Sequence, residues 1–434
     1  MAMDEQTKPA TPVEVPLTED RAMEVSVLAG SVFQPRTPIA AREFFAGRIK
    51  QITTLADAVA QTGLHVVIYG ERGVGKTSMA NVVKPLIEVF QERSNQTSGR
   101  LIVKTIADSV DTFSSLWRKL FDEITWTDNR PSIGLIPDGK KPELLRKAFG
   151  LPESLTVNDV RRTLARLSGA VFTIDEFDRA AERCSQEFTD LIKALSDLSI
   201  NCTVILVGVS DTVDSLIKNH ASITRALVQV FLPRMIAPEL REILTKAENA
   251  LTIRFMDDAA DLIVQISQGL PHYTHLVGLH AVRRAAGRLS ALVTRADVFA
   301  ALREAVAQAQ QSVTNTYSKA THSAHKEALY KHVLLACAVT AARSLDVLGF
   351  FNPGTVAKPL SSILNRPVEI AAFNHHLSEF SQAKRGEVLE RVGQQRAYRF
   401  RFRDPLLVPY IFMDAVNCGL IDDQKLSELL GEDF

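Results

Sequence analysis

The chain has 434 residues, of which 46% are apolar and 23% charged, and its formal net charge is zero. This profile is typical of a globular protein of two or three domains, and it excludes a global charge that would attract nucleic acid. The four cysteines (Cys184, Cys202, Cys337 and Cys418) have no paired spacing. Such scatter argues against a zinc site or a disulfide framework and favours the cytoplasm.

Residues 1–28 are predicted to form a disordered tail, because the first twenty residues are acidic, punctuated by proline and without an apolar core. The same composition excludes a signal peptide. No apolar run in the chain approaches the length needed to span a bilayer.

Residues 29–234 alternate strand-like and helical patterns, which predicts a doubly wound α/β domain. Short runs rich in β-branched residues predict parallel strands buried on both faces, at 64–70, 100–107, 170–176 and 202–210. Helical patterns occur at 113–124, 157–167 and 188–198. The segment 127–154 reads as an insertion or a long loop.

Residues 235–310 show helical patterns only and predict an all-α lid. Residues 311–323 read as a linker. In 324–434, a long apolar helix and shorter helices precede two strand-like runs at 387–392 and 396–402. This order predicts a winged-helix domain.

The stretch GERGVGKTS matches the phosphate-binding pattern G-x-x-x-x-G-K-[ST], between an apolar strand and a helical pattern. Its predicted nucleotide-binding residues are Gly70, Glu71, Arg72, Gly73, Val74, Gly75, Lys76, Thr77 and Ser78. Glycines let backbone N–H groups turn toward phosphate oxygens, Lys76 reaches the β- and γ-phosphates, and Thr77 ligates Mg²⁺. A chance glycine-rich turn is the alternative.

Asp175 and Glu176 end the strand at 170–176 and supply the acidic half of the site. Asp175 is predicted to be the second metal anchor, and Glu176 to activate the attacking water. The alternative is that these acids cap the next helix, a role that Asp178 could also fill.

With these motifs, residues 30–310 resemble the AAA+ ATPases and the related STAND signalling ATPases. The resemblance implies that Gly47 and Arg48, in FFAGRIKQI, lie near the nucleotide base. It also implies that Ser210, or Asp211, reads the γ-phosphate or orients water, unless it caps the next helix. Arg225 is the candidate arginine finger, acting across a subunit interface of a homo-oligomer, with Arg234 and Arg179 as alternatives.

The stretch GLPHY resembles the Gly-x-Pro element of STAND ATPases, in which the proline packs on adenine. This implies a base contact for Pro271, at a helix start where proline is tolerated, and it places His272 where replication initiators carry an arginine. A plain helix–helix turn is the alternative. The histidines His272, His275 and His280 lack a carboxylate or cysteine at matching spacing, so no metal is expected there.

Arg399, Arg401 and Arg403 alternate with aromatic residues in YRFRFRD, which predicts a basic ribbon. The ribbon would lie along a DNA backbone, with residues 368–382 as a recognition helix of little base-reading character. Docking within the chain or onto a protein partner is the alternative. The sequence therefore predicts an Mg²⁺-dependent ATPase switch that acts on DNA, or a STAND-like signalling or defence regulator that contacts protein.

Overall fold

The computed structural model describes residues 16–38, 45–85, 100–127, 130–132, 143–218, 220–323, 329–343, 349–394 and 397–431. They belong to two compact units. One unit comprises Thr37–Met235, and the other comprises Met1–Arg36 together with Ile236–Phe434.

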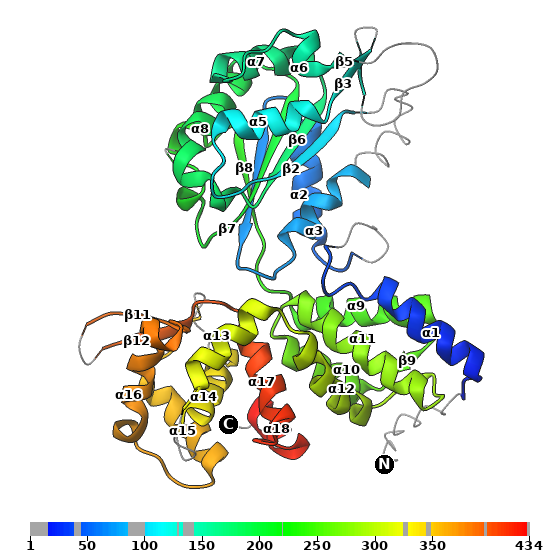
Figure 1. The fold of residues 1–434 in the computed structure, drawn as a ribbon, viewed down its shortest axis with the longest axis vertical. Coiled ribbons are helices and arrows are strands. Elements are labelled where there is room, and N and C mark those ends of the chain that lie inside the picture. The colour runs from blue at the N-terminus through cyan, green and yellow to red at the C-terminus, as the bar shows by residue number, and fades with distance from the viewer. Residues whose placement is uncertain are drawn as a thin grey trace, which may run out of the picture. The chain divides into compact units, whose positions relative to one another are not determined.

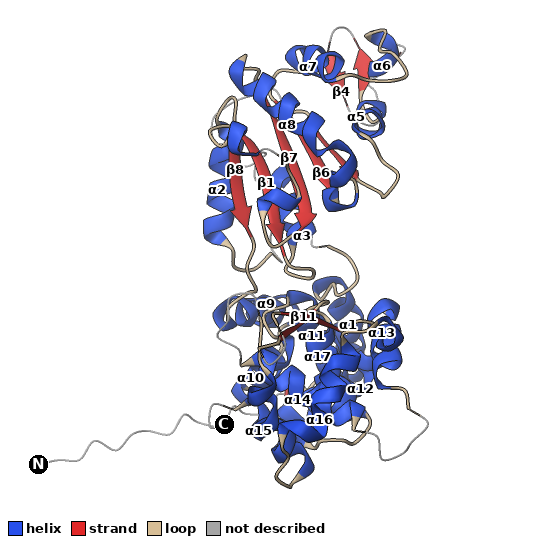
Figure 2. Cartoon of the chain, turned by 90° about the vertical axis from the view of Figure 1, so that its left-hand side faces the viewer, coloured by secondary structure: helices blue, strands red, loops and turns tan. Residues whose placement is uncertain are grey.

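The unit Thr37–Met235 is an α/β domain built on a five-stranded sheet in the order β2-β6-β7-β1-β8 (Figure 1). Its strands are β1 (His65–Gly70), β2 (Ile102–Ile106), β6 (Ala170–Asp175), β7 (Cys202–Val209) and β8 (Leu227–Phe231). Every neighbouring pair is parallel. The carboxyl ends of the strands therefore share one edge, and Figure 2 shows α3 beginning there. The predicted doubly wound P-loop fold is confirmed.

Helices flank this sheet. They are α2 (Ile49–Ala60), α3 (Lys76–Asn81), α5 (Phe113–Asp122), α6 (Leu145–Ala148), α7 (Val157–Arg166) and α8 (Ala181–Asp197). All six residues of β6 are buried, as expected for a strand covered on both faces. Aromatic rings fill the space between the sheet and α5, where Trp117 lies 5.4 Å from Phe172 between ring centroids.

The sequence patterns missed two features of this unit. Strand β8 lies at the edge of the sheet and alternates buried with exposed residues, so it lacks the continuous apolar run of the other strands. Within and beside the predicted insertion, β3 (Thr125–Thr127), β4 (Arg130–Ser132) and β5 (Glu143–Leu144) form a small antiparallel sheet.

The second unit is mainly helical. Its first part contains α1 (Glu19–Val32), α9 (Ala237–Leu251), β9 (Arg254–Phe255), α10 (Asp257–Ser267), α11 (Pro271–Gly287), β10 (Leu292–Val293) and α12 (Arg295–Gln308). Its second part contains α13 (Gln311–Thr321), α14 (Tyr330–Ala342), α15 (Pro353–Leu364), α16 (Ile370–Phe380), β11 (Leu389–Val392), β12 (Arg399–Phe402), α17 (Leu407–Asn417) and α18 (Asp423–Leu430). No helix in the described ranges is both long and apolar enough to cross a membrane.

The predicted tail 1–28 is wrong over its last ten residues, which belong to α1. Residues 1–15 lie outside the described residues. Thr18 caps the helix, and Val25 and Ala29 on its buried face share a helical spacing. Helix α1 packs on α11 and α9, so residues up to Arg36 belong with the helical unit rather than with the α/β domain.

The predicted linker 311–323 is also wrong, because α13 occupies Gln311–Thr321. Its buried Val313 and Tyr317 lie four residues apart, and the Tyr317 ring packs 5.2 Å from that of Tyr410. Burial on one helical face, rather than local propensity, explains this helix.

The elements expected of the C-terminal part occur in the predicted order, with three helices followed by the antiparallel pair β11 and β12. The start of the predicted helix 324–343 lies outside the described residues. Helix α17 was not foreseen. Ten of its eleven residues are buried, and it packs against both α12 and α14, so the lid and the C-terminal part form one compact unit.

Candidate nucleotide site

The loop between β1 and α3 has the backbone that a phosphate-binding loop needs. Gly70, Gly73 and Gly75 have φ values of 149°, 86° and 96°, a region that side chains other than glycine rarely adopt. At Gly70 a Cβ atom would lie 2.4 Å from the carbonyl oxygen of Leu232. The glycines of the motif are therefore required by local geometry, which argues against a chance turn.

Lys76 begins α3 and is buried, with 8% of its surface exposed. Its Nζ donates to two loop carbonyls, that of Gly70 at 3.1 Å and that of Glu71 at 2.7 Å. Burial lowers the pKa of Lys76 to about 8, although Asp178, Asp175 and Glu71 oppose the shift. A nearby phosphate would favour the charged form of this lysine, because an anion stabilises a buried ammonium group.

Thr77 and Asp175 converge beside this lysine, from α3 and from the end of β6. Thr77 Oγ1 lies 3.3 Å from Asp175 Oδ1, and Asp175 is buried. The spacing fits one Mg²⁺ ion held by both oxygens, since its ligand distances are about 2.0–2.1 Å. The donors are a hydroxyl and a carboxylate, the oxygen ligands that Mg²⁺ prefers, so the residues present fit the implied metal.

Asp175 has a further partner that sequence reasoning missed. Lys104, on the neighbouring strand β2, places Nζ 2.9 Å from Asp175 Oδ2 and 2.8 Å from Asn81 Oδ1. The available signal was a lysine within an otherwise apolar strand pattern, RLIVKTIA. Because β2 and β6 are neighbours in the sheet but far apart in the sequence, the lysine alone does not identify Asp175 as its partner.

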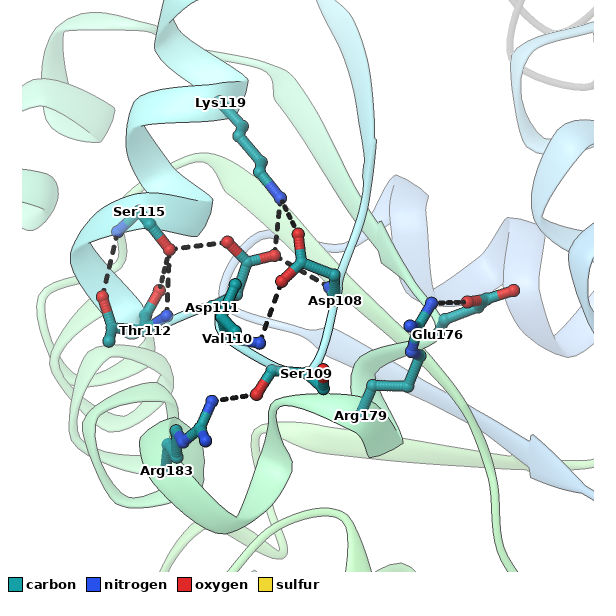
Figure 3. Close-up of polar contacts among 10 residues, drawn as sticks. All are labelled: Asp108, Ser109, Val110, Asp111, Thr112, Ser115, Lys119, Glu176, Arg179 and Arg183. Atoms are coloured by element: carbon teal, nitrogen blue, oxygen red, sulfur yellow. Dashed lines mark hydrogen bonds and ion pairs between the residues drawn. The ribbon is translucent and has the colours of Figure 1, made fainter.

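Glu176 follows Asp175 with a left-handed backbone, at φ 54°. Its side chain is half exposed, and Oε2 lies 2.9 Å from a guanidinium nitrogen of Arg179 (Figure 3). Arg179 was an alternative candidate for the arginine finger, but here it pairs with the acid of its own chain. In this arrangement the carboxylate that would activate water is partly neutralised.

The loop after β2 is tied to the segment after β6, as Figure 3 shows. Lys119 of α5 donates to Asp108 at 3.0 Å and to Asp111 at 2.6 Å, and Arg183 of α8 donates to the carbonyl of Ser109. The hydrogen bond to Lys119 lowers the pKa of Asp108. This network fixes the loop beside Glu176.

Ser210 follows β7, and its backbone N–H donates to the carbonyl of Gly70 at 3.3 Å. Its hydroxyl donates to the carbonyl of Thr212 at 2.6 Å and accepts from the Thr212 N–H at 3.1 Å. Ser210 thus lies next to the phosphate loop, with its hydroxyl used in a turn, whereas the N-cap of the following 3-10 helix is Thr212 and not Ser210. Asp211 beside it is exposed.

Asp178 does not cap α8. Its Oδ1 instead accepts from the backbone N–H of Val209 at 2.8 Å, which ties the ends of β6 and β7 together. Gly208 permits this contact, because a Cβ there would lie 3.1 Å from the Asp178 backbone nitrogen and 2.7 Å from Leu216. Neither role has a local sequence signature.

Gly47 and Arg48 both have positive φ, at 63° and 61°, just before α2. The Arg48 side chain is buried and donates to the carbonyls of Val74 and Pro233, at 3.3 and 2.5 Å. Arg48 therefore links the start of α2 to the phosphate loop and to the segment after β8.

A second brace joins the loop to the segment after β8. Arg234 Nε lies 2.8 Å from Glu71 Oε2, so this alternative finger candidate also has a partner in its own chain. Of the remaining loop positions, Arg72 is exposed and Ser78 is half-buried.

Arg225 is not brought to the phosphate loop of its own chain. It is exposed and precedes β8, whose amino end pairs with that of β1 through Leu227 and His65. Since the strands are parallel, Arg225 lies at the edge of the sheet opposite the loop.

Pro271 is the first residue of α11, the position at which a helix tolerates proline. Gly269, two residues earlier, has a φ of 78°. His272 Nδ1 lies 2.6 Å from the carbonyl oxygen of Pro35. His275 is buried against the ring of Phe33, and His280 pairs with Glu304 at 3.1 Å. Within the described ranges, no three His, Cys, Asp or Glu side chains gather as a metal site.

Similar structures include the Aeropyrum pernix ORC2 protein in ADPNP–ADP complexes, at 14% identity, a TM-score of 0.47, and coverage of 92% of this chain and 97% of that one. The Walker-type ATPase PABY2304 of Pyrococcus abyssi matches at 14% identity and a TM-score of 0.47, over 88% and 99% of the two chains. The Aeropyrum pernix ORC1 protein in complex with DNA matches at 16% identity and a TM-score of 0.43, over 90% and 97%. A search of curated proteins found no significant match.

A family model described as Novel STAND NTPase 1 matches residues 37–344. The match begins where the α/β domain begins and includes the phosphate loop, the acidic strand end and the lid. It confirms the resemblance to AAA+ and STAND P-loop ATPases. Because it covers more than half of the 434 residues, the chain belongs to the Novel STAND NTPase 1 family.

Proposed function

We propose that this protein is an ATP-binding and ATP-hydrolysing molecular switch. The observation that carries the proposal is the convergence of Lys76, Thr77 and Asp175 at the end of a glycine loop, with Thr77 Oγ1 3.3 Å from Asp175 Oδ1. At this point the negative charge of a phosphate chain would be balanced by a divalent cation and by the buried ammonium group of Lys76.

In the proposed mechanism, the loop amides and Lys76 bind the β- and γ-phosphates. Thr77 and Asp175 would hold Mg²⁺, which would supply charge neutralisation to the phosphates. Glu176 accepts a proton from the water as its oxygen bonds to the γ-phosphorus and the bond from that phosphorus to the bridging oxygen of ADP breaks, and the contact of Oε2 with Arg179 makes this carboxylate a weaker base. Arg225, exposed at the opposite edge of the sheet, would serve the site of another copy in a homo-oligomer.

Base recognition is assigned to the two remaining elements of the family pattern, Gly47–Arg48 and Pro271–His272. Pro271 offers a rigid apolar ring at the start of α11. A contact of this ring with adenine would let the lid respond to bound nucleotide, provided that ATP and ADP favour different arrangements.

The partner of the C-terminal part is the second question, and DNA was the first candidate because of the basic ribbon. The ribbon arginines, however, have local partners. Arg401 Nε lies 2.6 Å from Glu390, Arg403 lies 3.1 Å from Glu387, and Arg399 lies over the ring of Phe350 at 5.2 Å. Two of the three arginines are thus paired with acids, and this reduced net charge supports a winged helix that contacts protein, as in a signalling or defence regulator, over one that lies on DNA. The cytoplasmic location stays a prediction.

Replacing Glu176 with glutamine tests the hydrolytic role. We expect Glu176→Gln to lower steady-state ATP turnover by at least about a hundredfold, the contribution typical of a general base, while nucleotide affinity stays unchanged. The control is Glu123→Gln, which removes the same charge from an exposed acid after α5. Turnover by Glu176→Gln at the wild-type rate would show that another group activates water.

A further inference from the structure

Lys104 lies beside Asp175, one of the two proposed Mg²⁺ ligands. It projects from β2 onto Asp175 of β6, with Nζ 2.9 Å from Oδ2. The other partner of Nζ is Asn81, at the end of the helix that begins with Lys76 and Thr77. One carboxylate group separates the Lys104 ammonium from the Thr77 hydroxyl.

The hydrogen bonds of the Asp175 carboxylate are divided between two sides. Oδ1 lies 3.3 Å from Thr77 Oγ1 and accepts the backbone N–H of Glu176 at 3.0 Å, whereas Oδ2 faces Lys104. Only 4% of the Asp175 side chain is exposed, whereas 29% of the Lys104 side chain is, so water screens this ion pair only in part. A cation bound at Oδ1 would be repelled by the ammonium group of Lys104, which contacts the other oxygen of the same carboxylate.

The site therefore gathers two lysines around one buried carboxylate. Lys76 directly precedes Thr77, and its Nζ donates to the carbonyls of Gly70 and Glu71. Lys104 adds a second positive charge from the neighbouring strand. The Asp175 carboxylate is therefore already paired with one ammonium group before any metal binds.

We infer that Lys104 is a positioning residue that stabilises bound nucleotide phosphates without Mg²⁺ and weakens the hold of Asp175 on Mg²⁺. The inference rests on the proposed function, because it concerns the same nucleotide site. The resident ammonium supplies part of the charge that Mg²⁺ would supply, and it repels a cation placed beside Asp175. The protein should then bind ATP with little dependence on Mg²⁺.

A purely structural role for Lys104 makes a different prediction. If the lysine only braces Asn81 against Asp175, its replacement would weaken ATP binding equally with and without Mg²⁺, by disturbing α3. The dependence of ATP affinity on Mg²⁺ therefore separates the two roles, whereas catalytic activity alone would not.

The experiment measures the affinity of the full chain for a fluorescent ATP analogue, in EDTA and across an Mg²⁺ titration. For Lys104→Met we expect affinity in EDTA to fall about tenfold, because one nearby positive charge is lost. The Mg²⁺ concentration at half-saturation should fall about tenfold, because Asp175 is no longer shared. Lys104→Arg keeps the charge and should retain wild-type behaviour in both respects.

Two further variants keep the result interpretable. Lys104→Gln is a second neutral replacement that can still hydrogen-bond, and Lys193→Met removes a charge from an exposed lysine of α8. Equal losses with and without Mg²⁺, unchanged Mg²⁺ dependence in a folded neutral variant, or a shift in Lys104→Arg like that in Lys104→Met would overturn the inference. If the wild-type chain binds no ATP under either condition, the proposed function fails instead.

Discussion

Two contacts illustrate how closely the phosphate loop is fitted to its neighbours. Gly70 lies against the carbonyl of Leu232, and Arg48 reaches the carbonyl of Val74 from the other side. The loop is thus held between the start of α2 and the chain after β8. A change that pushes either neighbour away should distort the amides that face the phosphates.

Gly70→Ala should therefore be costly. Its φ of 149° and a Cβ placed 2.4 Å from a backbone oxygen leave no relaxed position for the methyl group. We expect a loss of at least about 2 kcal/mol in the free energy of unfolding of the α/β domain, measured by urea denaturation, together with weaker ATP binding.

The matched control for this change is Gly287→Ala, at the end of α11, where an added Cβ meets nothing within 4 Å. It should leave stability unchanged or raise it by up to about 1 kcal/mol, since alanine is the better helix former. Equal stability of Gly70→Ala and the wild-type protein would mean that the loop relaxes freely.

At this scale, Lys76 and Thr77 could be assigned from sequence because the phosphate motif is local, whereas Asp175, 98 residues after Thr77, was assigned from its place at the end of a strand. Lys76, Thr77 and Asp175 do converge. Lys104 could not be assigned to Asp175, because that contact depends on which strand lies beside β6. The role expected of Ser210, reading the γ-phosphate or orienting water, stays a prediction, and its hydroxyl here bonds within a turn formed with Thr212.

At the scale of the elements, helix α11 buries a histidine, His275, among apolar side chains. His275 is buried, and within the described residues neither of its ring nitrogens has a hydrogen-bond partner. Burial lowers the pKa of His275 to about 4 from an ordinary value of 6.5, and nearby His272 acts in the same direction. The helix thus contains a neutral imidazole packed as an apolar side chain against Phe33.

This histidine should make the helical unit sensitive to acid. Between pH 6.5 and pH 4 the unfolded chain binds the proton more readily than the folded one, so stability is complete above pH 6.5 and falls as the pH falls. The full loss from this group is about 3 kcal/mol.

We expect His275→Leu to remove this part of the acid sensitivity. Urea unfolding of both proteins at pH 7.5 and pH 4.5 would measure it, with the values at pH 7.5 as the internal reference. The same loss on acidification in variant and wild type would contradict the assignment, because a leucine cannot titrate.

Elements were predictable where a periodic pattern coincided with a buried face. The three central strands β1, β6 and β7 were found because each is almost continuously apolar, and edge strand β2 was found although it contains Lys104, whereas edge strand β8 was not found. Helix α13 was missed because its sequence is polar overall, and α1 was missed because it follows an acidic, proline-containing segment. Each buries only a narrow face, through residues such as Val25 and Tyr317.

For the whole molecule, the open choice is between DNA and protein as the partner of the C-terminal part. Reversing two ribbon charges, in the double variant Arg399→Glu and Arg401→Glu, addresses it. Because the arginines already have local partners, we expect retention of a labelled DNA duplex at low salt to be the same as in the wild type.

The control for this experiment is Arg254→Glu, which reverses an exposed charge on β9, elsewhere in the same unit. A selective loss of DNA retention in the ribbon variant would instead establish DNA as the ligand, because phosphate contacts depend directly on such charges.

The packing of α17 on α12 has a practical consequence for anyone who divides the chain into fragments. Arg295 of α12 binds Asp423 of α18 at 2.7 Å, and the hydroxyl of Tyr273 donates to the carbonyl of Leu406 at 2.5 Å. A fragment ended after the lid would lose both partners and expose the apolar face of α12 to water. The lid and the C-terminal part should be expressed, exchanged or fused together, and α1 belongs with them, because the helical unit also includes Met1–Arg36.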